Sequence, residues 1–513
     1  MNPVDEANKY LTRWSDNRFY LLILAILTLI TATVATVFVL VIQRNFLTIT
    51  CDTAFYQSGI VNLIHGNGFR DTAYDGPNVL GNHTTFVLML LAPIYALLPS
   101  PDTLFKLQVW GVYSAVLPLY LVAREISGKP LAAFLVAGSA LASPLFLHMA
   151  AAPFHPETWM AAAILWSFYF YRRNRPAGFW ISFFFAVCCN EQAALVYVAL
   201  GIAWLLVNDG VAWRKRYGKF ALAGGLAWLA FAMGVVTPMM HSPGQQQVLS
   251  YHYDNWGADV KSAPQLAGAI LGSPGKAASL LLSPDRWWYI AEIIGLPLLL
   301  VLGSRQALLL LLPFPFFFLM KDQEFFLYFH AYYYQFVFLA GYLALIYFVT
   351  RWDITTRVGA TVMAVTIACN MVLLSPAICE YAGFAAGADD GFSDVLRQVF
   401  AQLPTEAAVY GPHRYSAYLS DRPDMVMGDL SEENLDFKKM LDQRFDVTDV
   451  HPEEIQYIVC DLMNDQCGWR LGGYDADKTK RRADNVQRLI SSGQWTLLWS
   501  QQNVVILHRV KAN

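Results

Sequence analysis

The stretch that decides the fold is "FYLLILAILTLITATVATVFVLV" (residues 19–41), followed closely by "TITCDTAFYQSGIVNLIHGNGF" (residues 48–69). The first segment exceeds the about 20 apolar residues that cross a hydrocarbon core. It is also too long for a signal-peptide core and has no small-residue cleavage site, so we predict a first membrane helix. The second segment places one carboxylate, Asp52, at the head of a short amphipathic stretch directly beyond that helix.

Composition points to a membrane protein with many spans. The chain has 513 residues, of which 56% are hydrophobic, and its mean hydropathy is +0.36. The formal net charge of −3 gives no reason to expect a nucleic-acid partner. The sequence contains no Walker loop, no GxGxxG after a strand and no zinc-ligand spacing. ATP-driven transport and soluble nucleotide-sugar chemistry therefore lack their usual phosphate-binding motifs.

Basic loops set the expected topology, because Lys and Arg in short loops mark the cytoplasmic side. Three basic residues before the first helix put the N-terminus inside and the loop 44–102 outside. The next apolar segment, "TTFVLMLLAPIYALLP" (84–99), is short and contains Pro93. If it spanned the membrane, every later basic loop would be inverted, so we predict an interfacial or re-entrant helix there.

This assignment predicts about eleven spans in a transmembrane region, residues 1–378. After 19–41 they cover about 103–123, 130–150 and 157–171, two that meet at 188–192, 220–238, two that flank 303–306, 328–349 and 358–376. A long outer loop is expected at 239–286. No internal repeat is visible.

The composition of the chain changes at residue 379, and the pattern of residues 379–513 predicts a small α/β domain. Charge and turn residues return, and "AAVYGP", "IQYIVCDL" and "TLLWSQQNVVILHRV" alternate with polar helical stretches at 432–443 and 479–492. The topology places this domain in the periplasm of a bacterium, outside the inner membrane. Cys460 and Cys467 lie close enough in this domain to be compatible with a disulfide there.

Nearly every unusual polar residue falls at an outer helix end in this topology, although only basic loops were used to build it. These residues are Asp52, His65, His83, His155, Glu157, Asn190, Glu191, His241, His252, Asp254, Arg286, Lys321, Glu324 and His330. The clustering predicts a site that faces outward.

Most of these residues also have a purely structural explanation. Asp52 is either a helix cap or an acid held at the membrane surface to meet a lipid head group. His155 and Glu157 in "FHPE" either cap the next helix or belong to a site. Glu191 interrupts an apolar stretch, where a carboxylate costs about 2.5 to 3.5 kcal/mol on insertion scales, which favours function.

Two further groups are equally open. Arg286 in "SPDRWW" either snorkels to the surface or pairs with a lipid phosphate. His330 and Gln335 flank a run of tyrosines that forms either an interfacial aromatic belt or the lining of a sugar or head-group pocket.

The order of these features resembles the GT-C superfamily of polyprenyl-phosphate-dependent glycosyltransferases. More narrowly, several motifs resemble an uncharacterised bacterial membrane-protein family assigned to that superfamily, over roughly residues 45–430. They are "CDTAFYQSGIVNLIHGNGF", "NHTTFVLMLLAPIYALLP", "LFKLQVW", "FHPE", "NEQAAL" and "LPTEAAVYGPHRYSAYLSDRP". The resemblance implies a GT-C-like helical fold and an inverting transfer of sugar from a polyprenyl-phosphate carrier to an envelope glycan, lipid or protein.

Residue roles follow from the resemblance. Asp52 would be the general base of the first outer loop. A Lys-Glu element of the family appears here as Asn190-Glu191. If that Lys binds the donor phosphate in the family, this protein must use another cation, with Arg286 or Lys321 as candidates. The remaining candidates for holding substrate are His83, His155, Glu157, Glu191, His330 and Gln335.

The sequence leaves the cofactor and two rival functions open. Its acids and histidines are compatible with a divalent metal, but no cofactor is certain. The main rivals to an enzyme are a transporter and a lipid-binding scaffold of envelope biogenesis. Transporters usually show repeated halves and polar groups at the bilayer midplane. Since neither is seen here, the sequence favours the enzyme.

Overall fold

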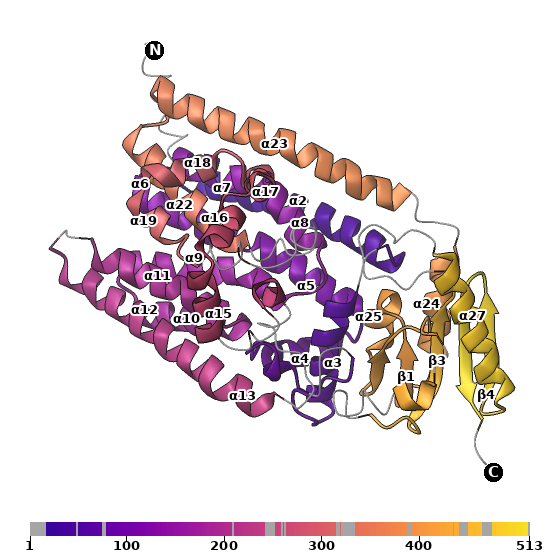
Figure 1. The fold of residues 1–513 in the computed structure, drawn as a ribbon. Coiled ribbons are helices and arrows are strands. Elements are labelled where there is room, and N and C mark those ends of the chain that lie inside the picture. The colour runs from indigo at the N-terminus through magenta and orange to yellow at the C-terminus, as the bar shows by residue number, and fades with distance from the viewer. Residues whose placement is uncertain are drawn as a thin grey trace.

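The computed structural model describes residues 17–47, 50–73, 78–207, 210–241, 252–257, 260, 263–313, 319, 334–386, 391–433, 436–440, 450–463 and 475–510. Helices make up most of the chain up to residue 386, and a small sheet with its own helices follows. Figure 1 shows the helical part beside the sheet, with the long helix α23 (Arg357–Ala386) running along one edge.

The first predicted span is confirmed as a long apolar helix, α2 (Asn17–Arg44). Much of its apolar surface is exposed, including Leu22, Leu29 and Val37, each more than half exposed. A soluble protein rarely exposes a contiguous apolar surface of this kind, so the helix suits a lipid environment.

Within the described residues, four helices are long and apolar enough to cross a membrane: Arg18–Arg44, Pro101–Ser127, Ala212–Met240 and Arg357–Cys379. The number rises to six if two bent helix pairs are each one span. One pair is Pro130–Leu141 with Pro144–Ala151, bent by 47°, and the other is Pro264–Gly272 with Pro274–Glu292, bent by 93°.

Other expected spans are present as shorter apolar helices. These are α10 (Pro176–Cys189), α11 (Gln192–Leu205) and α22 (Gln335–Arg351). They are shorter than the about 20 residues of a full crossing, so the count of eleven stays a prediction. The segment 84–99 contains only the ten-residue helix α4 (Leu88–Leu97), which agrees with a helix that does not span.

The prediction of a loop over 239–286 was wrong in its second half. Two helices occupy it, α15 (Ala263–Gly272) and α16 (Pro274–Leu281), and α17 (Pro284–Ile294) follows. Prolines at the first turns start α16 and α17, and the small residues Gly272 and Ser273 lie at the sharp bend between α15 and α16. The hydropathy pattern of the sequence did not predict these helices, because each is short.

The helical part contains further helices, some of which are segments of the candidate spans given above. They are α3 (Cys51–Ile64), α5 (Pro101–Tyr113), α6 (Val116–Ser127), α7 (Pro130–Leu141), α8 (Pro144–Ala151), α9 (Met160–Arg172), α12 (Ala212–Phe231), α13 (Thr237–Met240), α18 (Pro297–Leu300) and α19 (Arg305–Leu309). Two short 3-10 turns lie beside predicted site residues. The turn η1 (Val79–Gly81) precedes His83, and η2 (Pro156–Trp159) contains Glu157.

The C-terminal part is built on a five-stranded sheet of order β2-β1-β3-β5-β4. The strands are β1 (Ala408–Gly411), β2 (Met425–Met427), β3 (Ile455–Asp461), β4 (Trp495–Gln501) and β5 (Val504–Arg509). β1 runs parallel to β2 and β3, whereas β5 is antiparallel to β3 and β4. The α/β character is confirmed, and β2 was not predicted.

The sheet is accompanied by α24 (Phe392–Gln402), the short α25 (Ser416–Leu419) and α27 (Ala476–Ser491). The predicted helix at 479–492 corresponds to α27, whereas the one at 432–443 lies partly outside the described residues. Cys460 is buried in β3, and Cys467 also lies outside the described residues, so their disulfide stays a prediction.

The sheet part is joined to the start of α3. The Thr50 hydroxyl lies 3.2 Å from the carbonyl oxygens of His413 and Arg414, and it accepts from the N–H of Ala417 at 3.2 Å. Nearby, the N–H of Met427 in β2 donates to the Ala73 carbonyl at 3.1 Å. The sheet therefore fixes the helix on which Asp52 lies.

Candidate functional site

Asp52 lies in the first turn of α3, on the second residue of that helix. Its side chain is 31% exposed, in contrast to the residues that follow it. Thr50 occupies the N-cap position, so the explanation of Asp52 as the cap of this helix is wrong. Asp52 is therefore an acid that reaches solvent from an otherwise buried helix.

The same face of α3 meets the "FHPE" segment through three contacts. Asp52 Oδ2 lies 3.7 Å from His155 Nε2, and Tyr56, one turn later, donates its hydroxyl to Glu157 Oε1 at 3.0 Å. Between them, Thr53 Oγ1 accepts the N–H of Phe154 at 2.8 Å. The spacing of 52 and 56 explains this geometry, because residues i and i+4 lie on one helix face.

His155 is held in a buried, defined orientation. Its side chain is 6% exposed, and its Nδ1 lies 2.8 Å from the Pro153 carbonyl. A carbonyl oxygen only accepts, so Nδ1 carries the hydrogen. Burial lowers the pKa of His155, against smaller opposing effects of Glu157 and the Pro153 carbonyl. The imidazole is therefore neutral near pH 7.

Glu157 links this segment to the break between α10 and α11. It is 2% exposed, and its Oε1 accepts from Asn190 Nδ2 at 2.8 Å as well as from Tyr56. Asn190 Oδ1 accepts from the N–H of Gln192, which fixes the amide orientation. Glu157 Oε2 is buried without a hydrogen-bond partner among the described residues.

Glu191 is tied to the segment that carries His83. Its Oε1 lies 3.0 Å from His83 Nδ1, and its Oε2 accepts from the N–H and hydroxyl of Thr84 at 3.0 and 3.1 Å. Burial alone would raise the pKa of Glu191, but the charge and hydrogen bond of His83 and the Thr84 N–H bring it below its ordinary value. The carboxylate is thus ionised, and each of its two oxygens has a protein partner.

These contacts form one continuous set of polar residues, which we call the polar network. Its members are Asp52, Tyr56, His83, His155, Glu157, Asn190 and Glu191. Asn190 Nδ2 lies 3.5 Å from His83 Nδ1, so the two halves of the network are in contact, although both nitrogens donate to carboxylates, Asn190 to Glu157 and His83 to Glu191. The structure thus brings together six of the residues singled out in the sequence.

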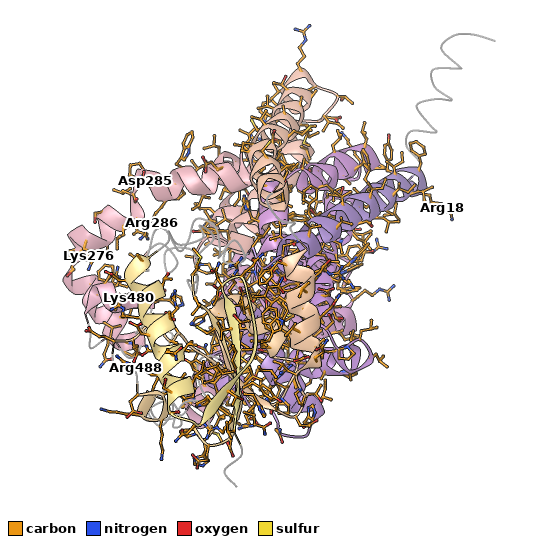
Figure 2. The ribbon with its side chains drawn as sticks, turned by 90° about the vertical axis from the view of Figure 1, so that its right-hand side faces the viewer. Arg18, Lys276, Asp285, Arg286, Lys480 and Arg488 are labelled. Carbon is orange, nitrogen blue, oxygen red and sulfur yellow. The ribbon has the colours of Figure 1, made fainter. Side chains whose placement is uncertain are left out.

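The other predicted site residues have different positions. Gln335 is fully buried and bonds the Glu157 carbonyl and the Ala161 N–H at 2.7 and 3.0 Å, so it supports the network through the backbone. Arg286 begins α17, which packs on α8, the helix leading into the "FHPE" segment. Figure 2 shows Arg286 and Lys276 on successive helices along one side of the molecule. Lys321 and His330 lie outside the described residues.

No metal site is formed within the part of the chain that the structure describes. There, no group of three or more His, Cys, Asp or Glu side chains is arranged to hold an ion.

Sequence reasoning missed three residues of the site: Tyr56, Thr84 and Gln108. Tyr56 carried a usable signal, its i+4 spacing from Asp52. Gln108 is a buried amide within "LFKLQVW" and bonds the backbone around His155. Its signal was a polar residue inside an apolar helix, which requires a hydrogen-bond partner.

Comparison with solved structures defines the class. The apo crystal structure of ArnT from Cupriavidus metallidurans matches with a TM-score of 0.50 at 13% identity, over 94% of this chain and 97% of the ArnT chain. The ArnT structure bound to undecaprenyl phosphate gives a TM-score of 0.49 at 12% identity, over 94% and 98%. The chain is a membrane protein with the fold of the GT-C glycosyltransferases.

The family is defined by the sequence itself. Residues 42–506 match the family model described as "Predicted membrane protein (DUF2079)", and the chain belongs to that family. No curated protein matches the sequence.

Proposed function

We propose that this protein is a membrane glycosyltransferase that moves a sugar from a polyprenyl-phosphate carrier to an envelope acceptor at the periplasmic face of the bacterial inner membrane. The observation that carries the proposal is the position of Asp52, which is partly exposed whereas most other members of the polar network are buried. A carboxylate in this position can take the proton of an acceptor hydroxyl. The GT-C-type fold supports this assignment.

The proposed reaction is a direct displacement at the anomeric carbon. The acceptor oxygen loses its proton to Asp52 and bonds to the sugar carbon, while the carbon–oxygen bond to phosphate breaks and its electron pair leaves with the phosphate. One displacement inverts the configuration. A cation must stabilise the leaving phosphate, and Arg286 on α17 is the described candidate. His83 and Glu191 would help to hold hydroxyl groups at the rim of the network.

A transfer assay with an Asp52→Asn variant tests the proposal. Protein in lipid nanodiscs is given the lipid-linked sugar that mass spectrometry finds accumulated in a deletion strain, together with envelope material from that strain. A general base contributes about 10² to 10⁴-fold, so Asp52→Asn should lower transfer by that factor while expression and insertion persist. Asn keeps the hydrogen bonding of Asp but removes its basic oxygen.

A matched control is Asp102→Asn. Asp102 also lies in the first turn of an outer helix by the proposed topology, but it forms an ion pair with Arg44. This variant should retain most of the transfer rate, since Asn still accepts from Arg44. Absence of any lipid-linked intermediate and of any transfer would refute the enzyme and favour the lipid-binding scaffold.

A further inference from the structure

Gln108 bonds the backbone on both sides of the site segment through its side-chain amide. It lies in α5 and is fully buried. Its Nε2, which has two hydrogens to donate, lies within hydrogen-bond distance of the carbonyls of Met149, Ala152 and Pro153, at 2.9, 2.7 and 3.0 Å, and its Oε1 accepts the N–H of His155 at 2.6 Å. The amide can sit only this way round, since flipping it would face oxygen to three carbonyls.

These bonds determine how His155 presents its ring. The Pro153 carbonyl receives both Gln108 Nε2 and His155 Nδ1, so Gln108 fixes the acceptor that holds the hydrogen on Nδ1. In the neutral ring, Nε2 then carries the lone pair and no hydrogen. That atom lies 3.7 Å from Asp52 Oδ2, and the edge of the Tyr56 ring packs against the imidazole at a centroid distance of 5.6 Å.

We infer that His155 Nε2 is a second proton acceptor that works with Asp52, and that Gln108 is the positioning residue that keeps Nε2 available. The inference rests on the proposed transfer reaction. The acceptor hydroxyl gives its proton to Asp52 as its oxygen bonds to the sugar, and the proton then passes to Nε2. The phosphate leaves with the electron pair of the broken bond, and Asp52 is ionised again.

The charges around His155 suit this role. Asp52 and Glu157 are both acids, and each stabilises an imidazolium once it forms. Burial and the charge of His83 act in the opposite direction and keep the resting ring neutral. A neutral ring beside two acids is ready to accept a proton and can pass it on after product leaves.

Kinetics of two variants test the inference. His155→Gln should lower kcat about tenfold to hundredfold and change the donor KM less than about twofold, since substrate binding does not require the proton acceptor. Gln108→Leu should lower kcat in the same direction by a smaller factor. Ser167→Ala is the matched control, because it removes another buried hydrogen bond, 2.6 Å long, to Tyr197. It should leave kcat unchanged.

A measurement without substrate separates this inference from general damage. Ring nitrogen NMR signals of His155, assigned by difference from His155→Gln, should show hydrogen on Nδ1 in the wild-type protein at about pH 7.5, above the ordinary histidine pKa. Gln108→Leu should give a mixture of both tautomers. A purely structural Gln108 would leave the tautomer unchanged.

The outcomes are distinguishable. Hydrogen on Nε2 in the wild-type protein, or a His155→Gln variant with full kcat, would overturn the inference and leave the proposed function intact. Absence of transfer by the wild-type protein would instead refute the proposed function, and the catalytic role of His155 with it.

Discussion

Glu157 offers the sharpest test of the polar network, because two buried donors share one of its oxygens. Tyr56 and Asn190 are 2% and 0% exposed, and both donate to Glu157 Oε1, at 3.0 and 2.8 Å. Glu157→Ala removes the hydrogen bonds of both donors to this oxygen. Each buried group left unpaired costs about 1 to 3 kcal/mol, so the free energy of unfolding should fall by about 2 to 6 kcal/mol.

Glu157→Gln should behave differently. The Gln carbonyl can accept from both donors, and the new amide group replaces Oε2, which has no partner among the described residues. We expect a cost of no more than about 1 to 3 kcal/mol, the penalty of one added unsatisfied group. The backbone carbonyl of Glu157, which accepts from Gln335, is the same in all variants.

The assay is unfolding by SDS titration in mixed micelles, followed by circular dichroism. Tyr197→Phe is the control, because it deletes a buried hydroxyl bonded to Ser167 and gives the cost of one lost bond. Equal destabilisation by Ala and Gln at position 157 would refute the argument, since it would show that the two shared hydrogen bonds do not stabilise the fold.

Other predictions concern the supports of the site. Thr50→Val should lower the free energy of unfolding by about 1 to 3 kcal/mol and make the C-terminal sheet more accessible to protease. An unchanged rate of protease cleavage would contradict the role of the Thr50 contacts in joining the sheet to α3. Gly111→Ala should destabilise by about 1 to 3 kcal/mol in the same titration, because a methyl group there collides with the indole of Trp159. The depressed pKa of Glu191 stabilises the fold above the unfolded-state value, so the stability gap between wild type and Glu191→Gln should shrink as pH falls through the folded pKa. Unfolding measured across pH checks this, and a constant gap would contradict it. Reporters fused after Arg173 and at the C-terminus should give cytoplasmic and periplasmic signals respectively, and a cytoplasmic C-terminus would refute the topology.

The sequence by itself determined the features that depend on local composition. The apolar run at 19–41 specified a long helix because its length and hydropathy leave no other stable state in lipid. The amphipathic stretch after Asp52 specified α3, and Glu191 was recognisable because a carboxylate in an apolar segment is costly. The helix at 476–491 and four of the strands were also readable from periodicity.

Only the tertiary structure decided which of these residues meet. Tyr56 and Glu157 are 101 positions apart, and His83 and Glu191 are 108 apart, so no local pattern encodes their contacts. The role of Gln108 depends on the three carbonyls and one N–H that tertiary packing brings around its side chain. A side chain's burial and hydrogen-bond partners depend on the segments packed against it, and the sequence of its own helix does not contain that information.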